Sequence, residues 1–263
     1  MEKKQGEIIF LGTGTSQGVP PIGCSHPVCI SEDTRDKRFR SSALIKYADT
    51  NIVIDCGPDF RQQMLNANVK KLEGIFFTHE HNDHISGLDD IRPFYYINGG
   101  HPMPLYGSRV VLDSIKQRFA YFFYEKKYPG VPDVDLNLID GAKINFMGLN
   151  ILPIEVMHGN QQIFGFKLGD LVYITDASHI NNASLDKINK CNILVLNALR
   201  KEPKHPSHFT LSEAIEISER IQPKKTYFTH ISHLLGFHKE VESELPENIH
   251  LAYDGLKVNF NLT

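Results

Sequence analysis

One short segment constrains this chain more than any other. It runs Thr78-His79-Glu80-His81-Asn82-Asp83-His84 and directly follows Ile75–Thr78, an apolar run typical of a β-strand. Three histidines and an aspartate within six residues serve no ordinary packing purpose. Imidazole and carboxylate groups at this density suit zinc, manganese or iron. The segment therefore predicts a metal-binding loop at the end of a strand, a place where functional residues are often found.

One loop does not complete the coordination of such ions, so further ligands are expected elsewhere in the chain. Three residues with metal-binding side chains each end a strand-like run: His158 after Ile154–Met157, Asp176 after Val172–Thr175 and His230 after Thr226–Thr229. Each alone would more often be a solvated loop residue. Because all three follow strands, we expect them to meet the histidine-rich loop at one edge of a sheet.

Short β-branched runs alternate with amphipathic segments along the chain. We predict strands at 8–11, 43–47, 52–55, 75–78, 150–156, 162–168, 171–175, 193–196 and 225–229, and helices at 58–67, 108–119, 211–221 and 234–245. Thr210 and Glu213 form a capping box at the start of the third helix. This pattern predicts an α/β protein in which helices cover two packed sheets. Its 263 residues suit a single domain over 1–263.

The stretch 93–135 is rich in Tyr, Phe, Gly and Pro. We predict an irregular insertion there, which would serve as a lid or as the contact of a homodimer. Its aromatic residues fit such a surface, but they also fit ordinary packing in the core. They are Phe119, Tyr121, Phe122, Phe123, Tyr124 and Tyr128.

The order of these candidate residues resembles the five-motif pattern of the metallo-β-lactamase superfamily over nearly the whole chain. The resemblance implies a four-layer αββα sandwich of two mixed β-sheets flanked by helices. It also implies two divalent metal ions, zinc or manganese. The first ion would be held by His79, His81 and His158, and the second by Asp83, His84 and His230, with Asp176 bridging them and Asp55 supporting the histidines from behind.

A second group of metal-binding side chains lies near the N-terminus, where Cys24, His26 and Cys29 share one loop. A closed structural zinc site has four ligands, and His233 would supply the fourth. The loop resembles the structural zinc loop of PhnP-type phosphodiesterases, although His26 stands where that family has a cysteine. The alternative is two free thiols beside unrelated histidines. The remaining cysteines, Cys56 and Cys191, lie in apolar runs and are expected to be buried.

The chain also resembles the PhnP-type family, the phosphoribosyl 1,2-cyclic phosphate phosphodiesterases, in Leu11–Gly14 and in Thr229–His233. That resemblance implies hydrolysis of a small phosphodiester, such as a cyclic ribose phosphate, by a hydroxide that bridges the ions, with Asp83 helping to orient it. His208 would protonate the leaving oxygen, because an alkoxide is a poor leaving group. His205 is a weaker candidate for this role, and a free surface histidine is the simpler interpretation of His208.

Other functions stay open from the sequence: a single-strand exonuclease of the same superfamily, a PqqB-like cofactor-biosynthesis protein, or a metal-binding protein without turnover. The complete ligand set, together with His208, favours hydrolysis. Substrate-binding cations are harder to select, and Arg61, Arg92, Arg200 and Lys201 are candidates that equally suit a solvated surface.

The net charge of −3 provides no long-range attraction for polyanions. The short interval between His158 and Asp176 also leaves no room for the RNA-binding arm of transfer-RNA 3′-processing enzymes of this superfamily. We therefore expect a small-molecule substrate and no nucleic-acid partner. No apolar stretch approaches the roughly 18 residues of a membrane span, and the N-terminus lacks a signal-peptide pattern. We expect a cytoplasmic protein with no membrane partner.

Overall fold

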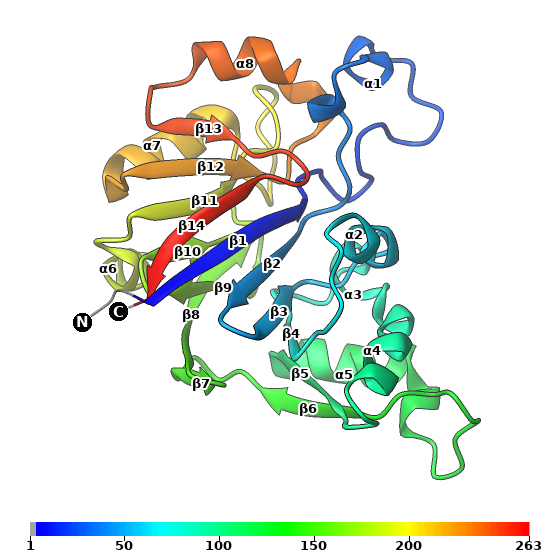
Figure 1. Cartoon of the computed structure of the whole chain (residues 1–263). Coiled ribbons are helices and arrows are strands. Elements are labelled where there is room, and N and C mark those ends of the chain that lie inside the picture. The colour runs from blue at the N-terminus through cyan, green and yellow to red at the C-terminus, as the bar shows by residue number, and fades with distance from the viewer. Residues whose placement is uncertain (1–3, 263) are drawn as a thin grey trace.

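The computed structural model describes residues 4–262, which form two sheets covered by helices (Figure 1). The first sheet has seven strands in the order β14-β1-β2-β3-β4-β5-β6. Neighbours from β14 to β3 pair antiparallel, and those from β3 to β6 pair parallel. The strands are β1 Lys4–Gly12, β2 Ser42–Tyr47, β3 Thr50–Ile54, β4 Gly74–Phe76, β5 Met103–Gly107, β6 Val134–Leu138 and β14 Lys257–Leu262.

The second sheet also has seven strands, in the order β13-β12-β11-β10-β9-β8-β7. Neighbours from β7 to β10 pair antiparallel, and those from β10 to β13 pair parallel. The strands are β7 Ile144–Phe146, β8 Leu149–His158, β9 Gln161–Leu168, β10 Leu171–Tyr173, β11 Ile193–Asn197, β12 Lys225–Thr229 and β13 Ile249–Leu251.

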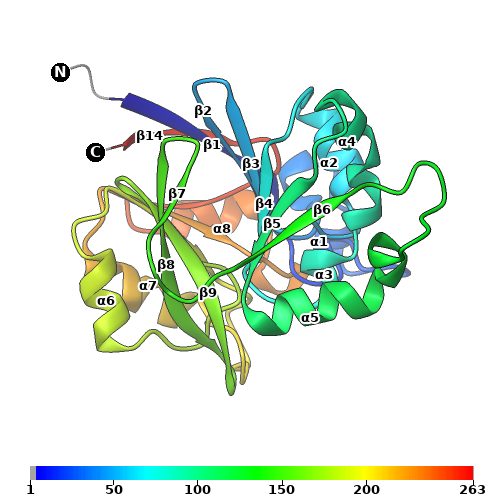
Figure 2. The same cartoon turned by 90° about the horizontal axis from the view of Figure 1, so that it is seen from below.

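Helices cover the outer faces of both sheets (Figure 2). Helices α2 and α5 contact the first sheet, whereas α6, α7 and α8 contact the second. The α-helices are α1 Pro27–Ile30, α2 Phe60–Asn66, α3 Asn82–Ile85, α4 Arg92–Ile97, α5 Arg109–Arg118, α6 Asn182–Ile188, α7 Leu211–Ile221 and α8 His238–Glu244. The 3-10 helices are η1 Thr34–Asp36, η2 Leu88–Ile91, η3 Ala120–Phe123 and η4 His233–Leu235.

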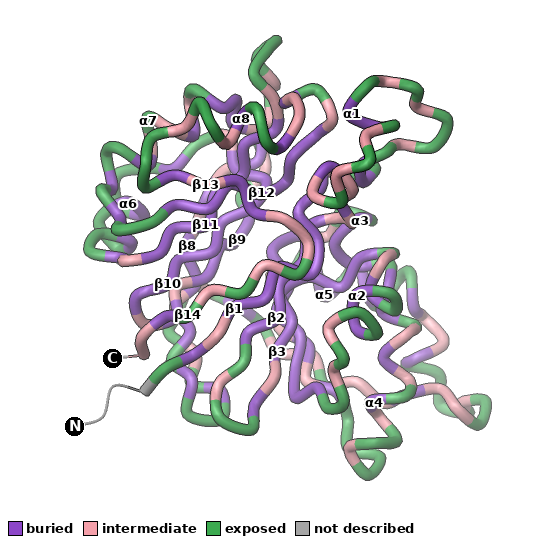
Figure 3. Tube along the Cα trace, turned by 45° about the horizontal axis from the view of Figure 1, so that its top comes forward, coloured by how far each residue is buried: buried purple, intermediate pink, exposed green. Residues whose placement is uncertain are grey.

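Three apolar layers hold these elements together. One layer, which includes Phe76, Phe166 and Tyr173, lies between the two sheets. The other two lie between each sheet and its own helices. Figure 3 shows the strands largely buried and the outer helical faces exposed. The predicted four-layer arrangement of two mixed sheets is confirmed.

Helix α7 shows how local sequence and packing agree. The capping box is present, because Thr210 Oγ1 accepts from Glu213 N at 3.4 Å and Glu213 Oε2 accepts from Thr210 N at 3.0 Å. Such a cap stabilises a helix by about 1 kcal/mol. The buried positions Leu211, Ala214 and Ile221 recur at helical spacing and pack on the second sheet.

Two expectations need correction. The stretch 93–135 is not irregular, because it contains most of α4, the whole of β5, α5 and η3, and the start of β6. Strands β5 and β6 extend the first sheet. Their sequences do not reveal these strands, because Pro and Gly interrupt β5, and Asp and Asn interrupt β6. The helix expected at 234–245 is divided into η4 and α8 at Gly236, where φ is +119° and helical geometry is lost.

The aromatic residues of that stretch are divided between core and surface. Phe119 and Phe122 are buried beneath the first sheet. Phe123, Tyr124 and Tyr128 are exposed. Within residues 4–262, no helix is both long and apolar enough to cross a bilayer.

Candidate metal centre

The predicted ligands meet at one edge of the sandwich. His79 follows β4, His158 ends β8, and His230 follows β12. The structure places their ligand atoms in two groups, within each of which every atom lies within 4.8 Å of the others. The groups are His79, His81 and His158, and Asp83, His84, Asp176 and His230. Candidate ligands that are far apart in the sequence therefore lie close together in the structure.

The backbone turns sharply where strands deliver these side chains. Asp55, Asp176 and His230 adopt left-handed φ angles of 65°, 59° and 55°. This conformation is uncommon outside glycine and asparagine-like residues, and it concentrates at functional sites. Gly57 serves the same turn, since a Cβ there would lie 2.0 Å from the carbonyl oxygen of Asp83. The strand ends are therefore shaped around the centre.

The chain itself orients the histidines. His84 Nδ1 lies 2.7 Å from Asp55 Oδ2, so its proton is donated to that carboxylate. His158 Nδ1 lies 2.7 Å from the carbonyl oxygen of Asp176 and donates to it. His79 Nδ1 lies 2.9 Å from Thr78 Oγ1, and that hydroxyl donates in turn to Asp55. In each ring Nε2 is therefore the nitrogen that a metal would take, and in His84 it lies 3.0 Å from Asp83 Oδ2.

Orphaned buried nitrogens test whether a metal fits here. Nε2 of His79 and Nε2 of His84 are both buried without a hydrogen-bond partner. Burial, and then the neighbouring His84, lowers the pKa of His79 well below its usual value, so this ring is neutral. Unpartnered imidazole nitrogens are costly in a protein interior. Divalent cations, one at each ligand group, would satisfy these two atoms, and the residues fit them.

The carboxylates support the same conclusion. Burial alone would lower the pKa of His84, but Asp83, Asp176 and Asp55 together raise it well above its usual value. Burial would raise the pKa of Asp176, yet His230 and His84 hold it well below its usual value. The cluster is thus rich in negative charge and draws in protons. A site that attracts cations in this way suits a divalent ion.

His230 is held differently from the other rings. Its Nδ1 lies 3.1 Å from Ser41 Oγ and 3.2 Å from Asp176 Oδ2. Its Nε2 lies 3.4 Å from Thr15 Oγ1. Burial lowers the pKa of His230, against the raising effect of Asp176. The ring therefore contacts both the acidic cluster and the N-terminal loop.

His208 stands beside the centre as expected. Its ring centroid lies 4.8 Å from those of His158 and His230, and its Nδ1 lies 3.8 Å from Asp176 Oδ1. Burial, and then His230, lowers the pKa of His208 to about 3. Its nitrogen is also close enough to His158 and Asp176 to count as a further possible ligand. His205 lies behind it, with ring centroids 4.8 Å apart.

Sequence reasoning missed several residues that position the centre. Asn197, the last residue of β11, accepts from Ala177 N at 2.7 Å and donates to Ala177 O at 2.9 Å, which fixes the turn after Asp176. Gln161 Nε2 donates to both carboxylate oxygens of Glu80, at 2.8 and 2.6 Å. A polar residue that ends an otherwise apolar strand was the available signal for Asn197.

None of the four basic residues considered as substrate-binding candidates lies unpaired at the metal centre. Arg92 pairs with Asp89 at 2.6 Å, and Lys201 pairs with Glu244 at 2.6 Å. Arg200 donates to the carbonyl oxygen of Pro203. Arg61 lines a separate groove between α2 and α4.

The second cluster is smaller. Cys24, Cys29 and His233 place their ligand atoms within 4.8 Å of one another. Burial, and then the Cys24 thiol, raises the pKa of Cys29 to about 11. His233 Nδ1 is buried without a hydrogen-bond partner, which fits a bound cation. His26 lies outside this compact group: its Nδ1 accepts from Val28 N at 3.3 Å as the cap of α1, and its ring centroid is 5.1 Å from that of His233.

The expected burial of the remaining thiols is observed. Cys56 is fully buried and Cys191 is 3 % exposed. Burial raises the pKa of Cys191 to about 11 and that of Cys56 well above its usual value.

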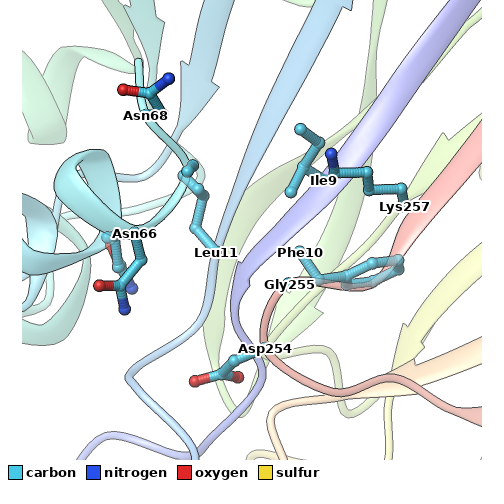
Figure 4. Close-up of a pocket in the computed structure, with 10 residues that line it drawn as sticks. Ile9, Phe10, Leu11, Asn66, Asn68, Asp254, Gly255 and Lys257 are labelled. Carbon is cyan, nitrogen blue, oxygen red and sulfur yellow. The ribbon is translucent and has the colours of Figure 1, made fainter.

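A cavity of about 300 Å³ lies away from both clusters. Residues of α2 line one side of it, and residues of β1 and of the segment before β14 line the other (Figure 4). It shares no residue with the ligand groups described above. The candidate chemistry therefore belongs to the histidine-rich edge.

A family model described as "Beta-lactamase superfamily domain" matches residues 50–231. This chain belongs to the beta-lactamase superfamily. Within the superfamily it belongs to the PhnP family: the crystal structure of a new diphosphatase from that family is 42% identical, covers 98% of each chain and has a TM-score of 0.92. Family, fold and ligand clusters together make the chain a metal-binding hydrolase of the metallo-β-lactamase fold.

Two curated relatives of this chain carry other names. An octanoyltransferase of Porphyromonas gingivalis (strain ATCC BAA-308 / W83) is 40% identical over 251 residues, which are 95% of this chain but 50% of that protein. The chain thus spans about half the length of that relative. A ribonuclease Z of Borrelia duttonii (strain Ly) is 24% identical over 300 residues, covering 85% of this chain and 92% of that protein.

Proposed function

We propose that this protein is a metal-dependent phosphodiesterase that hydrolyses a small phosphodiester, such as a cyclic ribose phosphate. One observation carries the proposal: two groups of ligand-competent atoms meet at one edge, with His208 beside both. A nucleophile, charge stabilisation and a proton donor are thereby within reach of one phosphorus atom.

The proposal assigns a role to each ligand. One divalent ion would be held by His79, His81 and His158, and the second by Asp83, His84 and His230, with Asp176 as a ligand that both could share. Zinc and manganese both accept imidazole and carboxylate ligands. When bound, such ions act as Lewis acids and lower the pKa of a coordinated water toward neutrality. Asp83 would also orient the attacking water, and Asp55 accepts the Nδ1 proton of His84, which directs Nε2 of that ring to the metal.

His208 is proposed to donate a proton to the departing sugar oxygen. In the protein alone its pKa of about 3 keeps the ring neutral at pH 7. An anionic phosphate beside Nδ1 favours the protonated ring, because an opposite charge raises the pKa of a histidine. The ring then becomes a proton donor when substrate binds, which is when the leaving oxygen needs one.

The central experiment assays the zinc- or manganese-loaded protein on a ribose 1,2-cyclic phosphate, on bis-p-nitrophenyl phosphate and on a labelled single-stranded oligonucleotide. We expect metal-dependent turnover of the two small diesters and little of the oligonucleotide. Preferential cleavage of the oligonucleotide would instead support an exonuclease. A fully metal-loaded protein that turns over none of them would contradict the proposal.

The leaving group tests His208. We expect His208→Ala to lose about 100-fold or more on the cyclic sugar phosphate, whose alkoxide needs a proton. The loss on bis-p-nitrophenyl phosphate should be far smaller, because p-nitrophenolate leaves unaided. Metal content should not change, and His205→Ala serves as the control. Equal losses on both substrates together with loss of metal would make His208 a ligand rather than a proton donor.

A second candidate substrate is a diphosphate, because the PhnP-family structure that is 42% identical is named a diphosphatase. Attack at phosphorus with metal assistance serves a phosphoanhydride as well as a diester. A nucleoside diphosphate sugar, assayed beside the cyclic phosphate, distinguishes the two substrates by kcat/KM. Octanoyl transfer is not carried over from the P. gingivalis relative, of which this chain spans about half.

The second cluster is proposed to hold a structural zinc ion through Cys24, Cys29 and His233, with His26 as the fourth ligand through Nε2, the nitrogen that does not cap α1. The ion would connect the N-terminal loop to η4, only three residues beyond His230. A small phosphodiester as partner, a cytoplasmic location and a homodimer contact remain proposals beside it.

A further inference from the structure

The glycine-rich segment that follows β1 lies against the metal centre. Gly14 forms a β-bridge with Ile231, the residue after His230. On either side of that bridge, Ile231 N donates to the carbonyl oxygen of Thr13 at 2.9 Å, and Thr15 N donates to the carbonyl oxygen of Ile231 at 3.1 Å. These backbone contacts fix the segment beside a candidate metal ligand.

Two glycines allow the segment to come so close. A Cβ at Gly12 would lie 2.0 Å from the carbonyl oxygen of Arg40, and one at Gly14 would lie 2.9 Å from the carbonyl oxygen of Phe39. Both obstacles are backbone atoms, which do not move aside as the end of a flexible side chain does. Any larger residue would therefore displace the segment, and with it Thr15, the residue that follows Gly14.

The hydrogen bonds of His230 show which of its nitrogens faces Thr15. Ser41 Oγ donates to the carbonyl oxygen of Gly14 at 3.0 Å, so it accepts from His230 Nδ1, which lies 3.1 Å away. Asp176 Oδ2, at 3.2 Å from Nδ1, is a second acceptor for the same proton. Nδ1 is thus the protonated nitrogen, and Nε2 is left for a metal ion. Thr15 Oγ1 lies 3.4 Å from that Nε2.

The Thr15 hydroxyl has a proton to donate at this place. Within residues 4–262, His230 Nε2 is the one hydrogen-bond partner of that hydroxyl. When a metal ion takes Nε2, the hydroxyl loses this acceptor and its proton becomes available to another. The side chain is partly exposed, so a bound molecule can reach it. An anionic phosphoryl oxygen is a suitable acceptor, because hydrogen bonds to charged groups are the strong ones.

Thr15 and His208 approach the centre from different directions. The ring of His208 stacks on the face of the His230 ring, with centroids 4.8 Å apart and planes inclined at 24°. Thr15 lies instead at the Nε2 edge of the His230 ring. Two donors placed in this way serve different oxygens of one phosphate. With His208 assigned to the leaving oxygen, Thr15 is left for an oxygen that stays on phosphorus.

We propose that Thr15 is a substrate-binding residue whose hydroxyl donates a hydrogen bond to a non-bridging phosphoryl oxygen at the second ion. The inference rests on the proposed phosphodiesterase function and deepens it. Gly12 and Gly14 place the residue, and Thr15 touches the substrate. A fixed donor aimed at an oxygen that gains charge during the reaction stabilises the transition state.

Thr15→Val tests this role, because valine removes the hydroxyl and keeps the shape of the side chain. We expect kcat/KM of the metal-loaded variant to fall about 100-fold. The loss should be equal on a ribose 1,2-cyclic phosphate and on bis-p-nitrophenyl phosphate, since both esters carry non-bridging oxygens. His208→Ala, in contrast, should distinguish the two esters by their leaving groups. Thr15→Ser should keep most of the activity, because it restores the hydroxyl.

Ser16→Ala is the matched control, since it removes a hydroxyl from the next residue, which is exposed. We expect it to keep full activity and full metal content. Undiminished activity in Thr15→Val would overturn the proposal. A Thr15→Val protein that has lost metal would also overturn it, because the hydroxyl would then hold His230 in place instead of binding the substrate.

Calorimetry with inorganic phosphate separates this inference from the proposed function. We expect metal-loaded Thr15→Val to bind phosphate about tenfold more weakly than the wild type, and Ser16→Ala to bind it equally well. Weaker phosphate binding at unchanged metal content supports Thr15 even where neither diester is turned over, a result that would contradict the phosphodiesterase alone. Equal phosphate affinity of wild type and Thr15→Val, or no measurable binding by either, would overturn the role of Thr15 whatever the activity.

Discussion

The two clusters of metal-binding side chains are built in different ways. At the sheet edge, chain partners already orient His79, His84 and His158 through Nδ1, and Asp55 lies behind them fully buried. In the N-terminal cluster, Cys24 and Cys29 pack in a small apolar group with Val19, Val28 and Phe237, and His233 Nδ1 has no hydrogen-bond partner. The first cluster is shaped by strands, whereas the second is shaped by short loops and a 3-10 helix.

This difference separates chemistry from stability. A centre that the fold positions in advance should keep its shape without ions and lose only activity, as preorganised catalytic sites do. Loops that an ion holds together should lose local structure when the ion is removed, because metal binding is then part of the folding free energy. The predictions below test this contrast, from the largest expected effect to the smallest.

Replacing Asp176, the carboxylate that we propose the two ions share, should have the largest effect. We expect Asp176→Asn to lower kcat/KM by about a thousandfold or more, since several kcal/mol of charge stabilisation are lost. The fold should survive, because strands and hydrogen bonds around the centre remain. Steady-state kinetics with circular dichroism and metal analysis check both parts. Asp186→Asn, an exposed substitution on α6, is the control. A variant that keeps a tenth of the activity would refute the assignment.

The N-terminal cluster should respond in the opposite way. We expect Cys24→Ser to lose one equivalent of zinc and to lower the free energy of unfolding on the order of 3 kcal/mol. The ligands at the sheet edge should still bind their ions. Denaturant unfolding and metal analysis measure these effects, with the neighbouring exposed Ser25→Ala as control. Unchanged zinc content in Cys24→Ser would argue for free thiols.

A smaller effect is expected behind the catalytic ligands. Asp55 accepts hydrogen bonds from Thr78 N, Thr78 Oγ1 and His84 Nδ1 at 2.8, 2.8 and 2.7 Å. Asp55→Asn should weaken metal affinity about 10- to 100-fold, as loss of an orienting carboxylate does. Activity should recover in excess metal, a rescue that a folding defect would not show. A metal titration measures this affinity. An unchanged metal affinity in Asp55→Asn would show that Asp55 does not orient the metal ligands.

The smallest effect concerns pH, at a third buried cluster that shares no residue with the metal-binding groups. His238 Nδ1 lies 3.0 Å from Arg38 Nη2 and accepts from it. Burial, and then Arg38, lowers the pKa of His238 to about 4 from an unfolded value of 6.5. The unfolded state therefore binds more protons in this window. Stability is complete above pH 6.5 and falls toward pH 4, by up to about 1.4 kcal/mol per pH unit.

His238→Asn tests this contribution. Comparing the variant with the wild type cancels the opposite contribution of Asp254, whose pKa burial raises to about 6. We expect the free energy of unfolding of the variant to fall less between pH 7 and pH 5. Parallel curves for the two proteins would show that His238 does not titrate in this window.

Secondary structure was predictable where the pattern was long. The buried β-branched runs of β1, β8 and β9 and the periodic apolar face of α7 were all anticipated, because burial on one or both faces determines composition. Strands β5 and β6 were not, since Pro and Gly in β5 and Asp and Asn in β6 interrupt the apolar pattern. Pairing of β5 with β4, and of β6 with β5, orders these two strands.

The residues of the candidate site also separate into those that the sequence revealed and those that only the structure revealed. His79, His81, Asp83 and His84 were recognisable from local density alone, and the structure brings the distant His158, Asp176 and His230 to them. Asn197, Ser41 and Gln161 were missed, because each acts through hydrogen bonds to residues remote in the chain, although Asn197 also ends an otherwise apolar strand. His26 shows the converse, since its expected place in the cysteine cluster competes with capping α1.

The sequence by itself determined which chemical groups are present, in which order, and which of them end strands, because side-chain chemistry and strand patterning are local properties. Only the tertiary structure decided which imidazole nitrogen is left bare, which carboxylates keep their charge, and that Thr15 faces His230. Those properties depend on burial and on contacts between distant residues, and the electrostatic energy of a group follows its surroundings in space.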